Sequence, residues 1–175
     1  LSSLATVLQL SLLLAAVHPP TLQAMLAPLI FAGVTVAIYA LVITVSCFHK
    51  ACPELGQPSQ TFSVKTAFGL AGVIAVALIA SAALNAWFGQ TGVVFASMAA
   101  GVADVHAAAI SVASLAAAGN VSAANAVVPI LLAFSINTFS KGVAALVSGG
   151  KDFAMQVIPG LLVQVLAAWM GWMLF

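Results

Sequence analysis

The chain has 175 residues, of which 64% are apolar and 4% are charged. Soluble domains carry about 25% charged residues, so this composition excludes a soluble protein and predicts an integral membrane protein that lies in a lipid bilayer. The formal net charge of +1 argues against a nucleic-acid partner, because no basic stripe is present to neutralise phosphates.

Six apolar runs are long enough, or nearly long enough, to cross a bilayer, which takes about 20 residues. His18-Pro19-Pro20 ends the first run, because consecutive prolines neither donate backbone hydrogen bonds nor continue a helix. Gly119-Asn120 ends the fourth, and Ser122 is a residue type that caps the start of the fifth. We therefore predict an all-α membrane protein of about six transmembrane helices, at residues 1–17, 22–48, 62–88, 93–118, 123–148 and 153–175.

These helices form one membrane domain, residues 1–175, with a repeat in it. Residues 21–30 can be laid over residues 122–131, so that Pro28 and Pro129 coincide. Halves of three helices each, residues 1–90 and 91–175, would then have opposite orientations, as in many transporters with inverted repeats. The alternative is a chance similarity between two apolar segments. Because the chain begins at Leu1 rather than Met, we also expect it to be a fragment of a longer chain.

The lysines give a weak indication of orientation. Lys50 and Lys65 flank the loop between the second and third predicted helices, whereas Lys151 is expected on the opposite side. Cytoplasmic loops carry an excess of Lys and Arg, so we expect this larger loop and both chain ends in the cytoplasm.

Asp104 and His106 fall near the middle of the fourth predicted helix. An ionisable residue at that depth costs roughly 2.5–3.5 kcal/mol on insertion scales and usually marks a functional site. Two positions apart, the two side chains point about 200° away from each other on a regular helix. They can both ligate one ion only if the helix is unwound there, which Gly101 permits but does not require. Asp104 is the stronger candidate, because its helix face continues through small or polar residues, among them Ser111.

The fifth predicted helix offers partners for Asp104. If the two helices pair antiparallel about Gly119-Asn120, Asp104 lies level with Ile136 and Asn137, and the long Lys141 side chain can reach back toward it. One interpretation is a polar pathway through the membrane, and the other is a structural Asp–Lys pair that holds two helices together. The predicted pathway residues are Asp104, Ser111, Asn137, Ser140 and Lys141.

These features favour a transport protein, either a channel or a carrier, for a small cation. Asp104 would supply a fixed negative charge, and His106 would be a second metal ligand or a titratable gate, because imidazole changes charge at about pH 5 to 8. The alternative is a non-transporting scaffold or regulatory module whose polar residues are helix contacts. No nucleophile–base arrangement, phosphate loop or HExxH motif indicates an enzyme, and no cofactor is expected beyond a bound cation. Tightly packed small residues leave little room for a pore inside one protomer, so a homo-oligomer, with a dimer favoured, is expected.

The sequence also resembles a known family. Residues 101–119, read with Pro129-Ile-Leu, Asn137-Thr-Phe-Ser-Lys141, residues 149–154 and residues 157–162, are similar to a membrane domain of unknown function found C-terminal to MgtC/SapB-type domains. The resemblance covers most of the chain from Phe62 onward and, more loosely, the first two helices. It implies a multi-pass protein of the bacterial inner (cytoplasmic) membrane, linked through its MgtC/SapB association to magnesium or other cation homeostasis. Many members carry a second Asp where this chain has His106, so the resemblance does not imply an all-carboxylate site here.

Overall fold

A computed structural model describes residues 2–49, 101 and 104–174, and all regular structure in these ranges is helical. The elements, in chain order, are α1 (Ser2–Val17), α2 (Pro19–His49), α4 (Val105–Ala117) and α5 (Ala123–Leu174). The all-α prediction is confirmed for these residues. The predicted helix at 62–88 and the first part of the one at 93–118 lie outside them.

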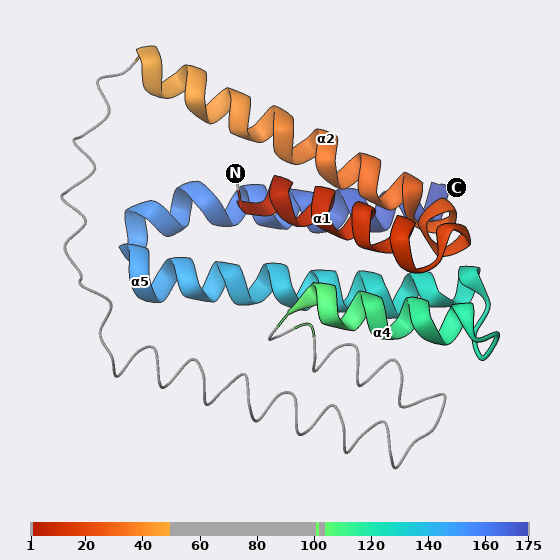
Figure 1. Ribbon diagram of the computed structural model, residues 1–175. Helices are drawn as coiled ribbons and strands as arrows, with labels where there is room; N and C mark the ends of the chain where they lie inside the picture. Colours follow the sequence, from red (N-terminus) through yellow and green to blue (C-terminus); the bar gives the residue numbers. More distant parts are fainter. Residues whose placement is uncertain (1, 50–100, 102–103, 175) are drawn as a thin grey trace.

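α5 is a hairpin rather than a single rod. The helix doubles back near residues 148–152, so that a first arm, Ala123–Val147, lies beside a second arm, Phe153–Leu174 (Figure 1). Ser148-Gly149-Gly150 falls at this bend, and sharp bends are commonly found at Gly/Ser pairs. The two helices predicted at 123–148 and 153–175 are therefore present, joined by a bend rather than a loop.

Three helical segments are long and apolar enough to cross a membrane: Pro19–Val45, Ala123–Val147 and Phe153–Leu174. Their outward faces carry large hydrophobic side chains, for example Ile30 and Ile38 on α2, each more than half exposed. A contiguous apolar surface of this kind is stable in lipid but causes aggregation in water. The protein is therefore a membrane protein.

The expected number of spanning helices needs correction within the described residues, which contain three such segments and not six. α1 and α4 are apolar but have only 16 and 13 residues. A helix of 13 residues is about 20 Å long, short of the roughly 30 Å hydrocarbon core of a bilayer. The difference from six thus arises at α1 and α4, which are too short, and at the run 62–88, which lies outside the described residues.

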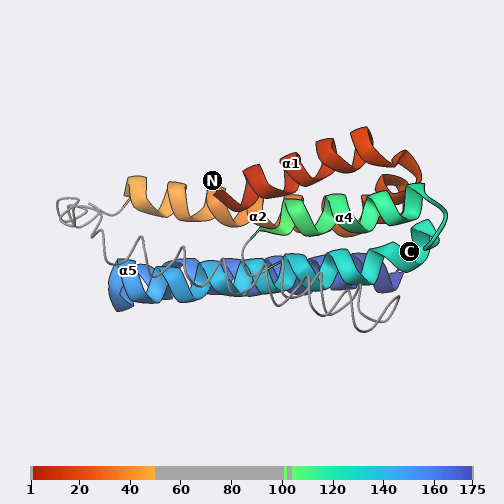
Figure 2. The same ribbon diagram turned by 60° about the horizontal axis from the view of Figure 1, so that its bottom comes forward.

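The helices lie in layers (Figure 2). The two arms of α5 form one layer, α2 and α4 lie on it, and α1 covers them from the other side. The buried residues of α4 recur every three or four positions, so one face of the helix, made of Ala and Val, packs into the core. The fully buried centre is mainly apolar and contains Leu10, Leu14, Met25, Val105, Val112, Val127, Ile130 and Leu131, with Thr21 and Gln164 as its polar members.

The predicted end of α1 and the predicted turn between α4 and α5 are confirmed, whereas α2 begins at Pro19 and not at residue 22. α1 stops before His18 and α2 starts at Pro19, where a proline loses no helical hydrogen bond. After α4, Gly119 has a φ of +77° and the N–H of Asn120 bonds to the carbonyl of Leu115. This is a Schellman ending, which favours glycine because the left-handed conformation strains other residues. The N–H of Asn125 bonds to Ser122 Oγ at 3.2 Å, so Ser122 caps α5 as predicted.

The directions of the helices contradict the inverted repeat. A Cβ added at Gly160 would meet the ring of Tyr39, and one added at Gly171 would meet Ala27 and Pro28, so α2 runs antiparallel to the second arm of α5. α2 therefore runs in the same direction as the first arm (Figure 1). Inverted halves require those two helices to run in opposite directions, so the prediction of inverted halves is wrong.

The end of α2 and the bend of α5 consequently lie at the same end of the bundle (Figure 1). The prediction that the loop after α2 and Lys151 lie on opposite sides is therefore also wrong. The prediction rested on counting crossings between these two points, and residues 50–100 of that stretch lie outside the described residues.

Candidate functional site at the start of helix α4

Asp104 is the N-cap of α4 rather than a residue in the middle of a helix. Its backbone is extended (φ −159°, ψ 118°), and its carboxylate accepts hydrogen bonds from the backbone N–H of His106 (2.9 Å) and of Ala107 (3.4 Å). Asp is among the preferred N-cap residues, and its negative charge complements the positive end of the helix dipole. The local sequence thus starts a new helix inside an apolar stretch.

Gly101 holds the chain ahead of this cap close to α5. A Cβ added at Gly101 would lie 2.6 Å from the carbonyl oxygen of Ala133 and 2.7 Å from its Cα. These are backbone atoms of a packed helix, which cannot move aside, so only glycine fits at this position. The approach fixes where Asp104 stands along the first arm of α5.

Asp104 and His106 form an ion pair, with His106 Nδ1 2.7 Å from Asp104 Oδ1. An ionised carboxylate can only accept, so Nδ1 carries the hydrogen and donates it. The Asp104 side chain is 52% exposed, whereas that of His106 is 24% exposed. The other ring nitrogen, Nε2, is enclosed and has no hydrogen-bond partner in the described part of the chain. In neutral imidazole this nitrogen presents a lone pair.

The sequence predicted that Asp104 and His106 could act together only if the backbone there is not helical, and Asp104 does have an extended backbone. On a regular helix the two side chains would diverge, but Asp104 has an extended backbone ahead of α4 and the side chains come into contact. They contact each other directly, so Asp104 Oδ1 is occupied by His106. Asp104 Oδ2 has only the long contact with Ala107 and retains capacity to accept.

Lys141 does not pair with Asp104. Its Nζ donates a hydrogen bond of 2.7 Å to the hydroxyl of Thr6 on α1. The reason is the register of α4 against α5, which the contact of Gly101 with Ala133 sets. From that contact, Asp104 is displaced toward the Gly119 turn, whereas Asn137 and Lys141 are displaced away from it. The sequence alone gave no indication that Thr6 would be the partner of this lysine.

The other predicted pathway residues are spread over the molecule. Ser111 is exposed on α4, away from the buried stripe that faces the core. Asn137 and Ser140 are half-buried on the first arm of α5. The structure thus brings together Asp104 and His106, and separately Lys141 and Thr6, and does not form one cluster of all five predicted residues.

Within the described ranges no group of three or more His, Cys, Asp and Glu side chains is placed to hold a metal ion. A cation beside Asp104 and His106 would therefore need further oxygen ligands, such as carbonyls, hydroxyls or water. The pair supplies one carboxylate oxygen and one imidazole nitrogen toward such a site.

A family described as "Domain of unknown function (DUF4010)" matches residues 1–149. The chain belongs to that family. The DUF4010 match includes the break at Asp104 and His106 and the first arm of α5 with Lys141, and it ends at the bend, before the second arm. No curated protein and no solved structure matches the chain.

Proposed function

We propose that this DUF4010 protein is a membrane transport protein, either a channel or a carrier, that moves a small cation past the Asp104–His106 pair. The observation that carries the proposal is the start of α4 at Asp104, within an apolar stretch, where Asp104 and His106 form an ion pair. Interrupted helices form the ion and substrate sites of many secondary transporters. Ionisable residues in membrane helices are costly and usually functional.

The geometry of the pair suits a cation ligand. Histidines that bind metal ions commonly donate their other ring N–H to a carboxylate, which fixes the ring and raises its basicity. Asp104 accepts such a bond from His106 Nδ1, and Nε2 is the nitrogen that remains for an ion. Protonation of Nε2 would remove that ligand.

The charges around the pair are also consistent with a cation. The positive end of the α4 dipole, equivalent to about half a charge, opposes a cation, and the full charge of Asp104 outweighs it. Lys141 would compete with the ion if it stood beside Asp104, but it is hydrogen-bonded to Thr6 instead. Asn137 and Ser140 on the first arm, and Ser111 on α4, would add neutral oxygens along the pathway.

The alternative is a non-transporting scaffold or regulatory module, and one observation favours it. Every hydrogen bond recorded for the Asp104 carboxylate goes to residues within three positions, as in an ordinary helix cap. In that case the pair has a structural role. Replacement of a capping Asp by Ala then costs about 1 kcal/mol of stability, while Asn serves nearly as well.

Two substitutions at Asp104 distinguish cation transport from a structural role, because one removes only its charge and the other removes both its charge and its helix cap. Asp104→Asn keeps a capping side chain and removes the charge, whereas Asp104→Ala removes both. The measurement is the flux of K⁺, Na⁺, Mg²⁺ and H⁺ into proteoliposomes that contain ion-sensitive dyes, with thermal unfolding in detergent as the control. Transport predicts that both variants lose flux and that Asp104→Asn unfolds like the unchanged protein.

Unchanged flux in a folded Asp104→Asn variant would rule out the pair as the ion site. The absence of flux of all four ions with the unchanged protein, together with a loss of stability only in Asp104→Ala, would establish the structural alternative.

We propose three further features. The protein works as a homo-oligomer, with a dimer favoured, because the closely packed helices leave little room for a pore within one protomer. The apolar run 62–88, outside the described residues, adds to the spanning segments and takes their number toward six. The sequence resemblance to domains associated with MgtC/SapB proteins supports a place in the bacterial inner membrane and a role in cation homeostasis. Chemical cross-linking in native membranes tests the dimer.

A further inference from the structure

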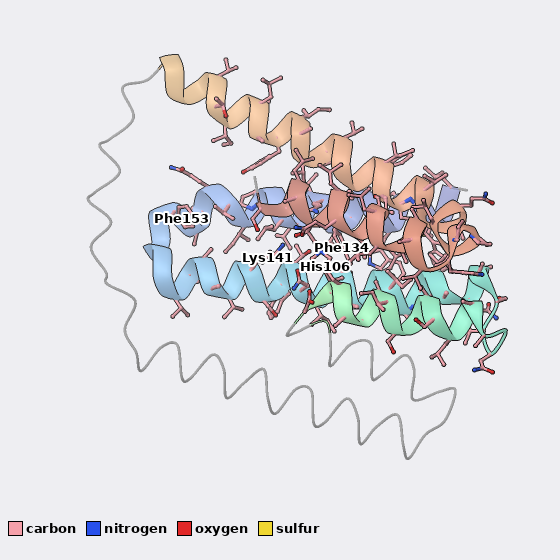
Figure 3. The ribbon with its side chains drawn as sticks, viewed as in Figure 1. His106, Phe134, Lys141 and Phe153 are labelled. Carbon is pink, nitrogen blue, oxygen red and sulfur yellow. The ribbon has the colours of Figure 1, made fainter. Side chains whose placement is uncertain are left out.

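Helix α1 forms an outer layer of the bundle, and one of its faces is exposed (Figure 2). Its opposite face packs inward, where the hydroxyl of Thr6 accepts a hydrogen bond of 2.7 Å from Nζ of Lys141, on the first arm of α5 (Figure 3). The exposed residues recur every three or four positions, so they lie on one side of the helix. This outward face consists of Ala5, Leu8, Gln9, Leu12, Ala15 and Ala16.

Gln9 is the polar residue of this outward face, and it lies near the middle of the membrane. α1 and α2 run antiparallel (Figure 1), and a Cβ added at Gly33 would lie 3.5 Å from Val7 Cγ1. Gly33 is near the centre of the span Pro19–Val45, and Gln9 is only about 3 Å further along α1 than Val7. The hydrocarbon core of a bilayer is about 30 Å thick, so either surface is roughly 15 Å away, beyond the reach of a glutamine side chain.

The position of Gln9 is unusual among the exposed amides of the described helices. The others lie near the ends of their spans, where headgroups and water can bond them, and are Gln23, Asn125 and Gln156. The Gln9 side chain has no hydrogen-bond partner among the described residues, and hydrocarbon offers none. A polar group without a partner in an apolar medium is costly, so this amide calls for a protein partner at its own depth that can both donate and accept.

The spacing of the outward face is that of a helix packed against a second helix. Its members form pairs seven residues apart, which are Ala5 with Leu12, Leu8 with Ala15 and Gln9 with Ala16. A seven-residue repeat keeps the same face of a helix against a partner helix over several turns. Leu12 and Leu8, which are 71% and 58% exposed, supply apolar contact, and the alanines let the two backbones approach.

We propose that the outward face of α1 is the contact between two copies of this chain, with the two Gln9 side chains bonded to each other. The interface rests on the homodimer proposed above and assigns it a surface. In a two-fold dimer the same residues of both copies meet at the axis, so the two Gln9 side chains lie at equal depth. An amide has an oxygen that accepts and an N–H that donates, so the pair exchanges two hydrogen bonds. Lipid offers neither bond, whereas a second copy offers both at the required depth.

The affinity of the dimer in liposomes tests the role of Gln9. Donor-labelled and acceptor-labelled copies of the full chain are reconstituted together, and energy transfer is measured as the protein is diluted with lipid. Gln9→Leu is expected to raise the dissociation constant about tenfold, an effect typical of hydrogen bonds between membrane helices. Gln9→Asn keeps a donor and an acceptor and is expected to retain most of the affinity. Gln23→Leu is the matched control, because it removes the same amide near the end of α2, and it is expected to leave the dissociation constant unchanged.

Disulfide cross-linking in native membranes tests the surface. In a chain with Cys47 and Cys52 replaced by Ser, Leu12→Cys is expected to form a disulfide between two copies. Ile30→Cys is the control, because Ile30 is also more than half exposed and lies at a similar depth on α2, and it is expected to form none.

Equal dissociation constants for the Gln9→Leu and Gln23→Leu variants would overturn the proposal. Cross-linking of Ile30→Cys and not of Leu12→Cys would retain the dimer but place its contact on α2, and would overturn this interface alone. The absence of energy transfer with the unchanged protein would overturn both the interface and the homodimer on which it rests.

Discussion

Asp104 shows how one residue can satisfy a local and a global requirement at once. As an N-cap it accepts two backbone N–H groups of α4 that otherwise lack partners. As an ionised group it holds His106 by its Nδ1 and leaves Nε2 enclosed within the protein. The sequence identified Asp104 as the principal candidate, but it treated His106 as a residue on a different face. The pair exists because the helix starts at Val105.

Gln164 is the other residue whose polarity is unusual for its position. It is 1% exposed on the second arm of α5, and its Oε1 atom has no hydrogen-bond partner among the described residues. A buried acceptor without a partner costs about 1–3 kcal/mol. Gln164→Leu is therefore expected to raise the thermal midpoint in detergent, equivalent to about 1 kcal/mol.

The control for this prediction is Gln23→Leu, at an exposed position on α2, which is expected to leave the midpoint nearly unchanged. A fall of the midpoint in Gln164→Leu would mean that the amide has a bonded partner, and the prediction would be wrong.

At the scale of the elements, close backbone contacts decide how α2 and α5 pack. A Cβ added at Gly171 would lie 2.9 Å from the carbonyl oxygen of Ala27 and 3.0 Å from the Cα of Pro28. Membrane helices associate through small residues that allow this kind of approach. Pro28 of α2 lies in this contact with Gly171 and is fully buried.

Gly171→Ala is thus expected to push α2 away from the second arm and to destabilise the protein by about 1–3 kcal/mol. Gly142→Ala is a matched control within α5, because its added Cβ would find its nearest neighbours at 3.9 Å, an ordinary contact. In that variant the higher helix propensity of alanine should give a gain of about 0.5–1 kcal/mol. The test is thermal unfolding of the two variants side by side, and equal midpoints would contradict the packing described for Gly171.

At the scale of the whole molecule, the order of the ends is a direct consequence of the helix directions. The end of α2 and the bend of α5 lie at one end of the bundle, and the Gly119 turn and the end of the second arm lie at the other (Figure 1). This arrangement differs from the one that a regular alternation of six helices predicts. It also determines which residues can be labelled from each side of a membrane.

In a chain with Cys47 and Cys52 replaced by Ser, single cysteines at His49 and Gly149 should react with a membrane-impermeant maleimide from the same side. A cysteine at Asn120 should react only from the other side. Labelling of sealed vesicles, before and after permeabilisation, measures this. Opposite sides for positions 49 and 149 would restore the inverted arrangement and contradict the observed helix directions.

The sequence by itself determined the class of the protein and most of its helix ends. Apolar composition excludes a water-facing surface, prolines stop α1, and Gly119 and Ser122 are local signals that act through the backbone next to them. The sequence also identified Asp104, since an ionisable residue in an apolar run is conspicuous. All of these depend on chemistry within a few residues of the chain.

Only the tertiary structure decided the break at Asp104, the partner of Lys141 and the directions of the helices. Alanine, valine and serine fit a continuous helix as well as an interrupted one, so composition cannot distinguish them. The contact of Gly101 with Ala133 sets the register between α4 and α5 and keeps Lys141 away from Asp104, and the packing of α1 brings Lys141 to Thr6, 135 positions away in sequence. Contacts between residues so distant depend on the packing of helices against each other, to which every apolar residue contributes a small and similar amount.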